Sequence, residues 1–258
     1  MNYQTVELHV DGQAAYLYLN RPNSLNAMDV QMISELTGAL KEVVTSGAKV
    51  LFISGRGRAF SSGGDIKTML SNNDPEAFFP IMEKIKELIL TLYTMPAITV
   101  SLIHGAAAGL GLSFALASDY VYVQTNSKVA MNFIKIGLLP DGGGHYFMKK
   151  RLGEHQAKHV IWEGENLTPE KALQIGLVDA VFEGELEDQI QEAKQRIETR
   201  PLQAMIATKE IYTKQGLAEL KETLDLETVN QSNMRKTADH LEGVKAFIEK
   251  RQPVFNAR

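Results

Sequence analysis

The middle third of the sequence repeats one short pattern three times, and this repetition constrains the fold more than any other feature. Each copy has a run of β-forming residues, then a glycine-rich bend, then apolar residues that can begin a helix. The copies are LFISGRGRAFSSGGDI from Leu51, TVSLIHGAAAGLGLSF from Thr99 and VAMNFIKIGLLPDGGGHYF from Val129. Strands that alternate with helices in this way predict an α/β core.

The segments around the three copies supply the other strands and helices of this core. Apolar and polar residues alternate on both sides of Asp11-Gly12, which predicts a β-hairpin over residues 6–19. Helical spacing of apolar residues, with Asp29 as N-cap and Gly47 as stop, predicts the first helix. The remaining expected elements are strands at 50–54, 98–103 and 177–182, and helices at 75–93, 110–118 and 169–176.

The last part of the sequence differs from the rest because it reads as helical from about Glu185 to the end. We therefore expect two parts, an α/β core of residues 1–184 and a helical subdomain of residues 185–258.

The composition excludes several classes of protein. With 44% hydrophobic and 22% charged residues, the chain lies in the ordinary range of globular proteins. The formal net charge is -4, so no basic field would attract nucleic acid or an anionic membrane, and we expect neither as a partner. The absence of cysteine excludes disulfides, thiolate nucleophiles and cysteine-ligated zinc. The first residues lack the pattern of a secretion signal, which fits a cytoplasmic protein.

One stretch, residues 96–118, carries no Asp, Glu, Lys or Arg and is long enough to cross a bilayer. It contains Ser101, His104 and Gly105, and it changes from β-branched residues to alanine and leucine. This change is expected of a buried strand that turns into a buried helix, so we predict no membrane span.

The first two glycine-rich bends are candidates for binding an oxyanion. A bend without side chains lets backbone N–H groups approach a ligand closely, and the start of a helix favours negative charge. The expected donors are the N–H of Gly64 and the N–H of Leu110. Taken alone, each glycine cluster is more often a tight turn that packing requires. A dinucleotide site is a poorer interpretation, because the spacing does not match G-x-G-x-x-G and no acidic residue ends a strand about 20 residues later.

The third bend places one carboxylate, Asp141, between apolar residues and three glycines. A carboxylate in an apolar pocket has a raised pKa and can accept and return a proton near neutral pH. The ordinary alternative is an aspartate that accepts backbone N–H groups in a Pro-Asp-Gly turn. His155 and His159 lie one helical turn apart but have no third ligand at suitable spacing, so we expect no metal.

Several ordered motifs resemble those of the crotonase superfamily, the enoyl-CoA hydratases and isomerases, over essentially the whole chain. They are LNRPNSLNAM at Leu19, GRGRAFSSGGDIKTM at Gly55, HGAAAGLGLSFALASDY at His104, FIKIGLLPDGGG at Phe133, LTPEKALQIGLVDAV at Leu167 and AFIEKRQPVF at Ala246. The resemblance implies a spiral of ββα units that forms two nearly perpendicular sheets. It also implies C-terminal helices that mediate trimerisation, with trimers commonly pairing into hexamers.

The resemblance further implies an acyl-CoA thioester as the partner, with coenzyme A as part of the substrate and no separate cofactor. Family members stabilise an enolate with two backbone N–H groups, which match those of Gly64 and Leu110, although leucine is unusual at the second position. Each such donor contributes about 3 to 4 kcal/mol of transition-state stabilisation. The substrate and CoA contacts implied by matching positions are Arg21, Ala59, Ser61, Ser62, Asp65, Ile66, Lys67, Phe133, Phe247 and Lys250, the last two from this subunit or a neighbour.

The sequence departs from the hydratase pattern at the two positions where hydratases carry glutamates. Ser113 and Phe133 stand there, and neither side chain can act as a general base. Asp141 instead matches the aspartate of dienoyl-CoA isomerases, of the ring-epoxide isomerase of phenylacetate degradation and of chlorobenzoyl-CoA dehalogenases. The run MNFIKIGLLPDGGG is most similar to the phenylacetate-pathway isomerases. This favours an enoyl-CoA isomerase with Asp141 as the base. The alternatives are a hydratase without the usual glutamate pair, or a catalytically silent acyl-CoA binder.

Overall fold

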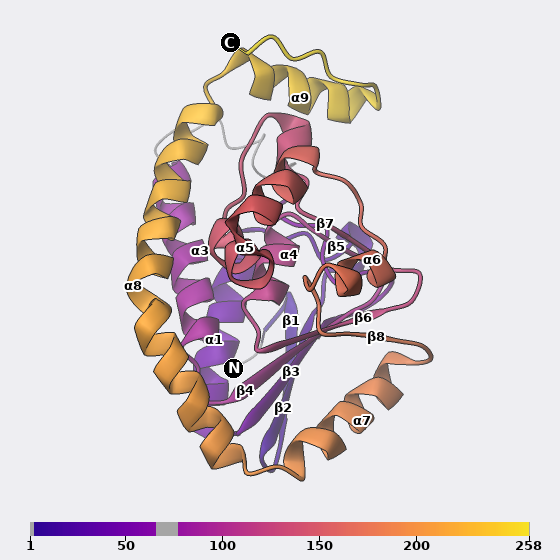
Figure 1. Cartoon of the computed structure of the whole chain (residues 1–258), viewed down its shortest axis with the longest axis vertical. Coiled ribbons are helices and arrows are strands. Elements are labelled where there is room, and N and C mark those ends of the chain that lie inside the picture. Colours follow the sequence, from indigo (N-terminus) through magenta and orange to yellow (C-terminus); the bar gives the residue numbers. More distant parts are fainter. Residues whose placement is uncertain (1–2, 66–76, 258) are drawn as a thin grey trace.

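The computed structural model describes residues 3–65 and 77–257, and its centre is a six-stranded sheet (Figure 1). The strand order is β1-β2-β3-β4-β6-β8, with β1 antiparallel to β2 and every other pair parallel. The β1–β2 hairpin turns at Gly12, whose φ of 59° is the left-handed conformation that glycine adopts most readily, as the sequence predicted. The strands are β1 Val6–Asp11, β2 Ala14–Leu19, β3 Val50–Gly55, β4 Ile98–Ile103, β6 Tyr120–Gln124 and β8 Ala180–Phe182.

A second, two-stranded sheet is formed by β5 (Ala106–Ala108) and β7 (Lys128–Ala130), which are parallel. Ser61 pairs with Ala107 in an isolated bridge, so the first glycine-rich bend runs beside β5. The small sheet therefore brings the first repeated bend next to the segment that leads into the second.

The helices are wound between and after the strands. They are α1 Val30–Ser46, α3 Phe78–Tyr93, α4 Leu110–Leu116, α5 Gly144–Glu163, α6 Pro169–Gln174, α7 Leu186–Glu198, α8 Leu202–Met234 and α9 Ala238–Glu249, with 3-10 turns η1 Pro22–Ser24 and η3 Phe133–Ile136. The predicted boundaries of α1 are confirmed, because Asp29 accepts a hydrogen bond from the Met32 N–H and Gly47 ends the helix at φ 77°. The expected start of the next helix at residue 75 lies outside the described residues.

Several predicted boundaries differ from those of the structure. α6 ends at Gln174, two residues before the predicted end at Gly176, and β3 extends one residue farther, to Gly55. α4 ends at Leu116, two residues before the predicted end at Ser118. β8 begins at Ala180 and not at Leu177, because the N–H groups of Leu177 and Val178 donate to the Ala172 carbonyl and so continue the turn that closes α6.

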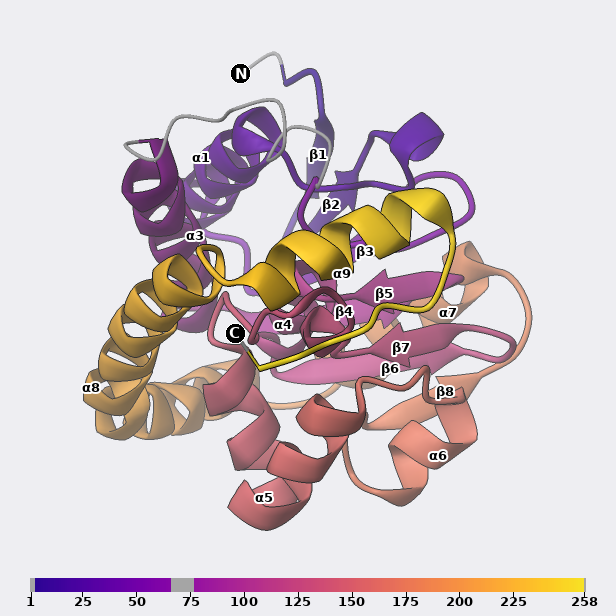
Figure 2. The ribbon, with the colours of Figure 1, turned by 90° about the horizontal axis from the view of Figure 1, so that it is seen from above.

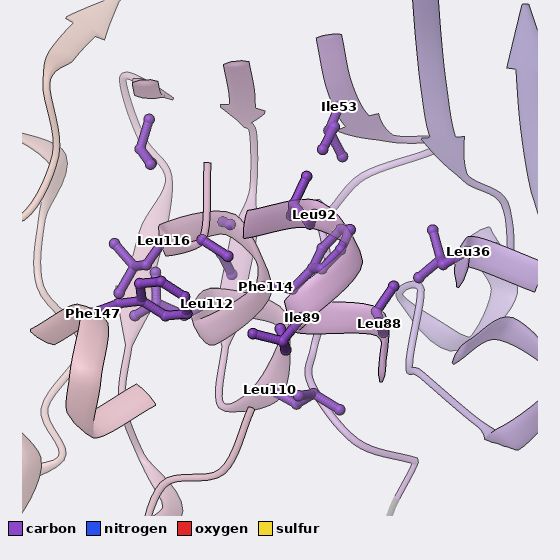
Figure 3. Packing of buried hydrophobic residues seen from close by; sticks show 14 of the residues in the cluster. Leu36, Ile53, Leu88, Ile89, Leu92, Leu110, Leu112, Phe114, Leu116 and Phe147 are labelled. Atoms are coloured by element: carbon purple, nitrogen blue, oxygen red, sulfur yellow. The ribbon is translucent and has the colours of Figure 1, made fainter. Parts of the chain in front are cut away.

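Alternating residues of the strands point to opposite faces of the large sheet, and each face has its own core. On one face, Leu17 and Leu51 pack with the apolar sides of α1, α3, α4 and α5. Figure 3 shows this cluster around Phe114 of α4, with Leu88, Ile89 and Leu92 of α3 beside it. On the other face, Tyr16 and Phe52 pack with α7 and the first turns of α8.

α8 runs along one side of the molecule past α3 (Figure 1). Its first residues cover the second core, whereas Leu220 and Leu224 near its middle belong to the first. Farther along, the inward face changes from apolar to polar, since Glu227 and Gln231 are both buried. This polar section of α8 contacts the third glycine-rich bend.

The expectation that the chain is helical to its end is wrong for residues 251–257. Lys250 ends α9 in the left-handed conformation at φ 55°, and the chain then turns back beside α9 (Figure 2). The Val254 N–H donates to Glu242 and the Asn256 N–H donates to Asp239, which hold the returning segment against the helix. In the part of the chain that the structure describes, no helix is both long and apolar enough to cross a bilayer.

Candidate active site

The first two glycine-rich bends lie side by side. The Ser61 N–H donates to the Ala106 carbonyl and the Ala108 N–H donates to the Ser61 carbonyl, each at 3.0 Å. Gly63 has a φ of 96°, and a Cβ atom at this position would lie 2.7 Å from the Ala108 carbonyl oxygen and 3.4 Å from the Leu110 nitrogen. The absence of a side chain at residue 63 thus permits the close approach of the first bend to the start of α4.

The N–H groups of Gly64 and Leu110 are available to a ligand. In the bridge between Gly64 and Met28, the Met28 N–H donates to the Gly63 carbonyl and the Asp65 N–H donates to the Met28 carbonyl. The Gly64 N–H forms no hydrogen bond in this bridge. Leu110 is the first residue of α4, where a backbone N–H has no partner within the helix. Among the hydrogen bonds of residues 3–65 and 77–257, neither N–H donates to another group of the protein. Both residues line the same two cavities.

The third bend packs on the second through its glycines. A Cβ atom at Gly142 would lie 2.5 Å from the Leu110 side chain, and one at Gly144 would lie 2.9 Å from the Ser113 hydroxyl. Side chains at these positions would push the bend away from α4. The close packing brings Asp141 to the two cavities lined by Gly64 and Leu110.

Asp141 is 8% exposed, and its two carboxylate oxygens have different surroundings. Oδ2 accepts a hydrogen bond from Gln231 Nε2 at 3.2 Å, whereas Oδ1 has no partner among the described residues. The side-chain oxygen of Gln231, Oε1, is also buried without a partner there. Buried polar atoms are nearly always hydrogen-bonded, so two orphaned oxygens beside a cavity indicate a place where a ligand or water binds.

The surroundings of Asp141 raise the pKa of its carboxyl group. The pKa of its carboxyl is raised to about 7, mainly by burial and also by the nearby charge of Glu227, while the hydrogen bond from Gln231 acts in the opposite direction. A carboxyl group with a pKa near the working pH can both remove a proton and return it. The catalytic role of Asp141 expected from the sequence stays a prediction.

Glu227 holds the third bend in place. Its carboxylate is 2% exposed and accepts from the Gly143 N–H at 2.7 Å and from the His145 N–H at 3.0 Å. The Nδ1 atom of His145 lies 2.8 Å from the same carboxylate. Glu227 therefore accepts hydrogen bonds from N–H groups at the start of α5 that have no partner within the helix, directly after Asp141.

Sequence reasoning did not identify Glu227, Gln231 or Arg235. A signal was present, because three polar residues spaced by four fall on one face of a helix that would otherwise be buried. A long helix rich in charged residues hides this spacing, since exposed faces show the same residue types.

Two cavities meet at Asp141 and at the backbone of Gly64 and Leu110. They share five residues: Gly64, Leu110, Asp141, Gln231 and Arg235. The first cavity is otherwise mainly apolar, with Met28, Val30, Ile33, Phe78, Ile81 and Met82 in its wall. The second has a volume of about 190 Å³ and is bounded on one side by η3 and on the other by His240, Val244 and Phe247 of α9. The arrangement offers an apolar compartment and a separate approach, with the reactive groups between them.

Some of the expected contact residues line these cavities. Ser62, Phe133 and Phe247 line the second cavity, and Asp65 lines the first. Phe133 also lies next to the second bend, since a Cβ atom at Gly109 would be 3.5 Å from its ring. Ser113 of α4, at the other position where hydratases have a glutamate, is fully buried and lines neither cavity.

Other expected contact residues make contacts within the protein or lie elsewhere. Ala59 and Ser61 are buried, and the Ser61 hydroxyl donates to the Asn26 carbonyl. The Arg21 guanidinium forms ion pairs with Asp65 at 3.1 Å and Asp29 at 3.2 Å. Lys250 is exposed at the end of α9 and lines neither cavity. Ile66 and Lys67 lie outside the described residues.

The rings of His155 and His159 are 4.7 Å apart on α5. Within residues 3–65 and 77–257, no group of three or more His, Cys, Asp or Glu side chains is arranged to hold a metal ion.

Comparison with known proteins indicates one family. The enoyl-CoA hydratase/isomerase family model matches residues 10–258. YhaR of Bacillus subtilis (strain 168), whose name places it in the enoyl-CoA hydratase/isomerase class without choosing between the activities, is 47% identical over 255 residues, covering 98% of this chain and 99% of that protein. The 1,2-epoxyphenylacetyl-CoA isomerase of Escherichia coli (strain K12) is 31% identical, covering 97% of each chain.

The fold comparison gives the same result. The crystal structure of an enoyl-CoA hydratase from Mycobacterium avium subsp. paratuberculosis K-10 superposes with a TM-score of 0.88 at 32% identity, covering 99% of this chain and 100% of that one. The expected crotonase fold is therefore confirmed. This chain belongs to the enoyl-CoA hydratase/isomerase family, the crotonase superfamily.

Proposed function

We propose that the protein is an acyl-CoA isomerase in which Asp141 moves a proton between two carbons of a thioester-conjugated acyl group. The observation that carries this proposal is that Asp141 Oδ1 and the N–H groups of Gly64 and Leu110 have no partner among residues 3–65 and 77–257, and that all three residues line the same cavities. These are the parts that such a reaction requires: one base and two donors for the developing oxyanion.

The thioester carbonyl accepts hydrogen bonds from the N–H groups of Gly64 and Leu110. Asp141 Oδ1 removes a proton from one carbon of a β,γ-unsaturated acyl group, and the electron pair delocalises into an enolate whose oxygen the two N–H groups stabilise. The carboxylic acid then returns the proton to a second carbon, and the double bond moves into conjugation. The acyl group occupies the apolar cavity, and the rest of the thioester leaves through the second cavity beneath α9.

Asp141, the proposed base, supports the branch expected from the sequence, the phenylacetate-pathway isomerases. The Escherichia coli isomerase that matches along the whole chain acts on an acyl-CoA, as its name states. Its identity to this chain is 31%, lower than the 47% of YhaR. The acyl group of the phenylacetate pathway is therefore one of the thioesters to be tested below and not the assigned substrate.

Hydration is the second candidate, and one observation favours it. Asp141 Oδ1 and Gln231 Oε1 are both orphaned, and a water held between two acceptors could attack an activated double bond. Incubation with crotonyl-CoA separates the two candidates, because hydration removes the absorbance of the conjugated thioester and isomerisation does not.

The isomerase is tested by solvent exchange. A panel of saturated and unsaturated acyl-CoA thioesters is incubated with the protein in deuterium oxide and analysed by mass spectrometry. We expect deuterium at carbon in thioesters that the protein converts, because the proton on Asp141 exchanges with solvent while the enolate is held. A protein that binds these thioesters without incorporating deuterium would be a silent binder, and the isomerase proposal would fail.

We also propose that the protein assembles as a trimer or as a pair of trimers. Large apolar side chains remain exposed on the C-terminal helices of the isolated chain, namely Leu226 and Val229 of α8 and Leu241, Phe247 and Ile248 of α9. Exposed apolar side chains in such number are typical of association surfaces. Light scattering on the purified protein is expected to give three or six times the mass of one chain, and the mass of a monomer at micromolar concentration would contradict this.

A further inference from the structure

α8 contributes a cation to the site in addition to Gln231. Arg235 is the C-cap of α8 and keeps a helical backbone conformation, with φ -57° and ψ -19°. It follows Gln231 by four residues, so the two side chains project from the same side. Like Gln231, Arg235 lines both cavities. A positive charge is therefore present near the base, on the border of a cavity whose wall is mainly apolar.

The Arg235 guanidinium has no anionic partner among residues 3–65 and 77–257. None of the ion pairs in this part of the chain includes it, and its central carbon lies 5.1 Å from the centre of the Phe78 ring. The side chain is half-buried, and burial lowers the pKa of Arg235 with no acidic group acting against it. Arginine nevertheless stays protonated in proteins.

The carboxylates of the same cavity are already engaged. Asp29 caps α1 and forms an ion pair with Arg21, and Asp65 also forms an ion pair with Arg21. Asp141 is the base and receives a hydrogen bond from Gln231. Arg235 is thus the charged group of this cavity that is left for a ligand, and a half-desolvated guanidinium binds a carboxylate through two parallel hydrogen bonds.

The position of Arg235 favours the acyl group over CoA as the source of the anion. Phe78, which packs against the guanidinium, lines the apolar cavity and not the second one. One helical turn, about 5 to 6 Å along α8, separates Arg235 from the glutamine that bonds to the base. The phosphates of CoA are separated from the thioester by the whole pantetheine arm, and they would lie beyond the second cavity.

We propose that the substrate is the CoA monothioester of a short dicarboxylic acid, and that Arg235 binds its distal carboxylate. This inference rests on the proposed function, since it assumes that the thioester lies at Gly64, Leu110 and Asp141 and that the acyl chain enters the apolar cavity. The distal carboxylate would then turn toward the guanidinium, which borders the apolar cavity beside Phe78.

The test compares three thioesters that differ only at the far end of the acyl chain: β,γ-unsaturated hexenedioyl-CoA, its ω-methyl ester and β,γ-unsaturated hexenoyl-CoA. We expect kcat/KM for the free diacid to exceed that for each neutral thioester by about 10- to 100-fold, the range for a hydrogen-bonded charge pair. Activity on hexenoyl-CoA with no preference for the diacid would overturn this inference and leave the isomerase standing. No activity on any of them, together with no deuterium exchange across the wider panel, would refute the isomerase itself.

Variants then assign the preference to Arg235. Arg235→Met keeps an unbranched side chain against Phe78 and removes the charge, so the ratio of kcat/KM for diacid over monoacid should fall about 10- to 100-fold. Arg235→Lys should retain part of the ratio. Lys236→Met removes an exposed cation from the next residue and should leave the ratio unchanged. An unchanged ratio in Arg235→Met would overturn the proposal.

A last arm distinguishes the acyl carboxylate from a CoA phosphate. The diacid and monoacid are offered as N-acetylcysteamine thioesters, which have no phosphate. If Arg235 binds the acyl carboxylate, the diacid preference and its loss in Arg235→Met persist with these thioesters. If Arg235→Met instead weakens both CoA thioesters equally and has no effect on the N-acetylcysteamine thioesters, the anion is a phosphate and the assignment to the acyl group is wrong.

Discussion

Replacement of Asp141 by asparagine is expected to lower kcat for isomerisation on the order of 10³-fold while the protein still binds acyl-CoA. Asparagine has nearly the same shape but cannot accept a proton, and general acid–base catalysis by one positioned side chain contributes about 10²- to 10⁴-fold. The donors for the thioester oxygen are backbone N–H groups of Gly64 and Leu110, so the substitution leaves them in place. Deuterium exchange at carbon should fall in parallel with kcat, because both require the same proton removal.

Binding is measured separately by calorimetry with a non-reactive saturated acyl-CoA, and we expect a Kd within a few-fold of that of the unchanged protein. Glu222→Gln provides the matched control, since it makes the same carboxyl-to-amide change at an exposed position of α8. Full activity in a purified, folded Asp141→Asn variant would remove the base from the mechanism. Loss of acyl-CoA binding together with activity would mean that Asp141 acts on binding or structure, and the catalytic role would be unsupported.

The parts of the site that the sequence predicted are those encoded locally. Gly64 and Leu110 belong to glycine-rich bends that follow β runs, and Asp141 stands in the third copy of the same pattern. Each of these positions can be identified from neighbours within a few residues, because turns and helix starts are specified by short-range backbone preferences. The β1–β2 hairpin and the caps of α1 were predictable for the same reason.

The parts that the sequence did not predict depend on contacts between distant segments. Gln231 is 90 residues from Asp141, and Glu227 is 84 residues from the Gly143 N–H that it binds. The four-residue spacing of these polar side chains does not distinguish a buried face from a solvated one on a helix rich in charged residues. The returning segment after α9 is a similar case, since its N–H groups are satisfied by Asp239 and Glu242, earlier in the chain, and not by a continued helix.

The raised pKa of Asp141 should lower the free energy of unfolding in a pH-dependent way. The pKa of Asp141 is raised from 3.8 to about 7 in the folded protein. Below about pH 4 both the folded and unfolded states hold this proton, so the carboxyl has no effect on the free energy of unfolding. Between about pH 4 and 7 the unfolded state releases the proton and the folded state keeps it, and stability falls by up to about 1.4 kcal/mol per pH unit. Above about pH 7 both states are ionised and the penalty is constant.

Asp141→Asn removes this titration, so the inactive variant should be the more stable protein at alkaline pH. The side-chain amide of asparagine can accept from Gln231 Nε2 and donate to Gln231 Oε1, which has no partner within the described part of the unchanged protein. Denaturant unfolding at equal protein concentration should show a difference between variant and unchanged protein that grows from pH 5 to pH 8 by about 2 to 3 kcal/mol in favour of the variant. All other titrating groups are common to both proteins and cancel in this difference. Parallel stability curves over this range would show that the carboxyl is not held neutral by the fold. Asp141 would then lack the property that makes it a base near neutral pH.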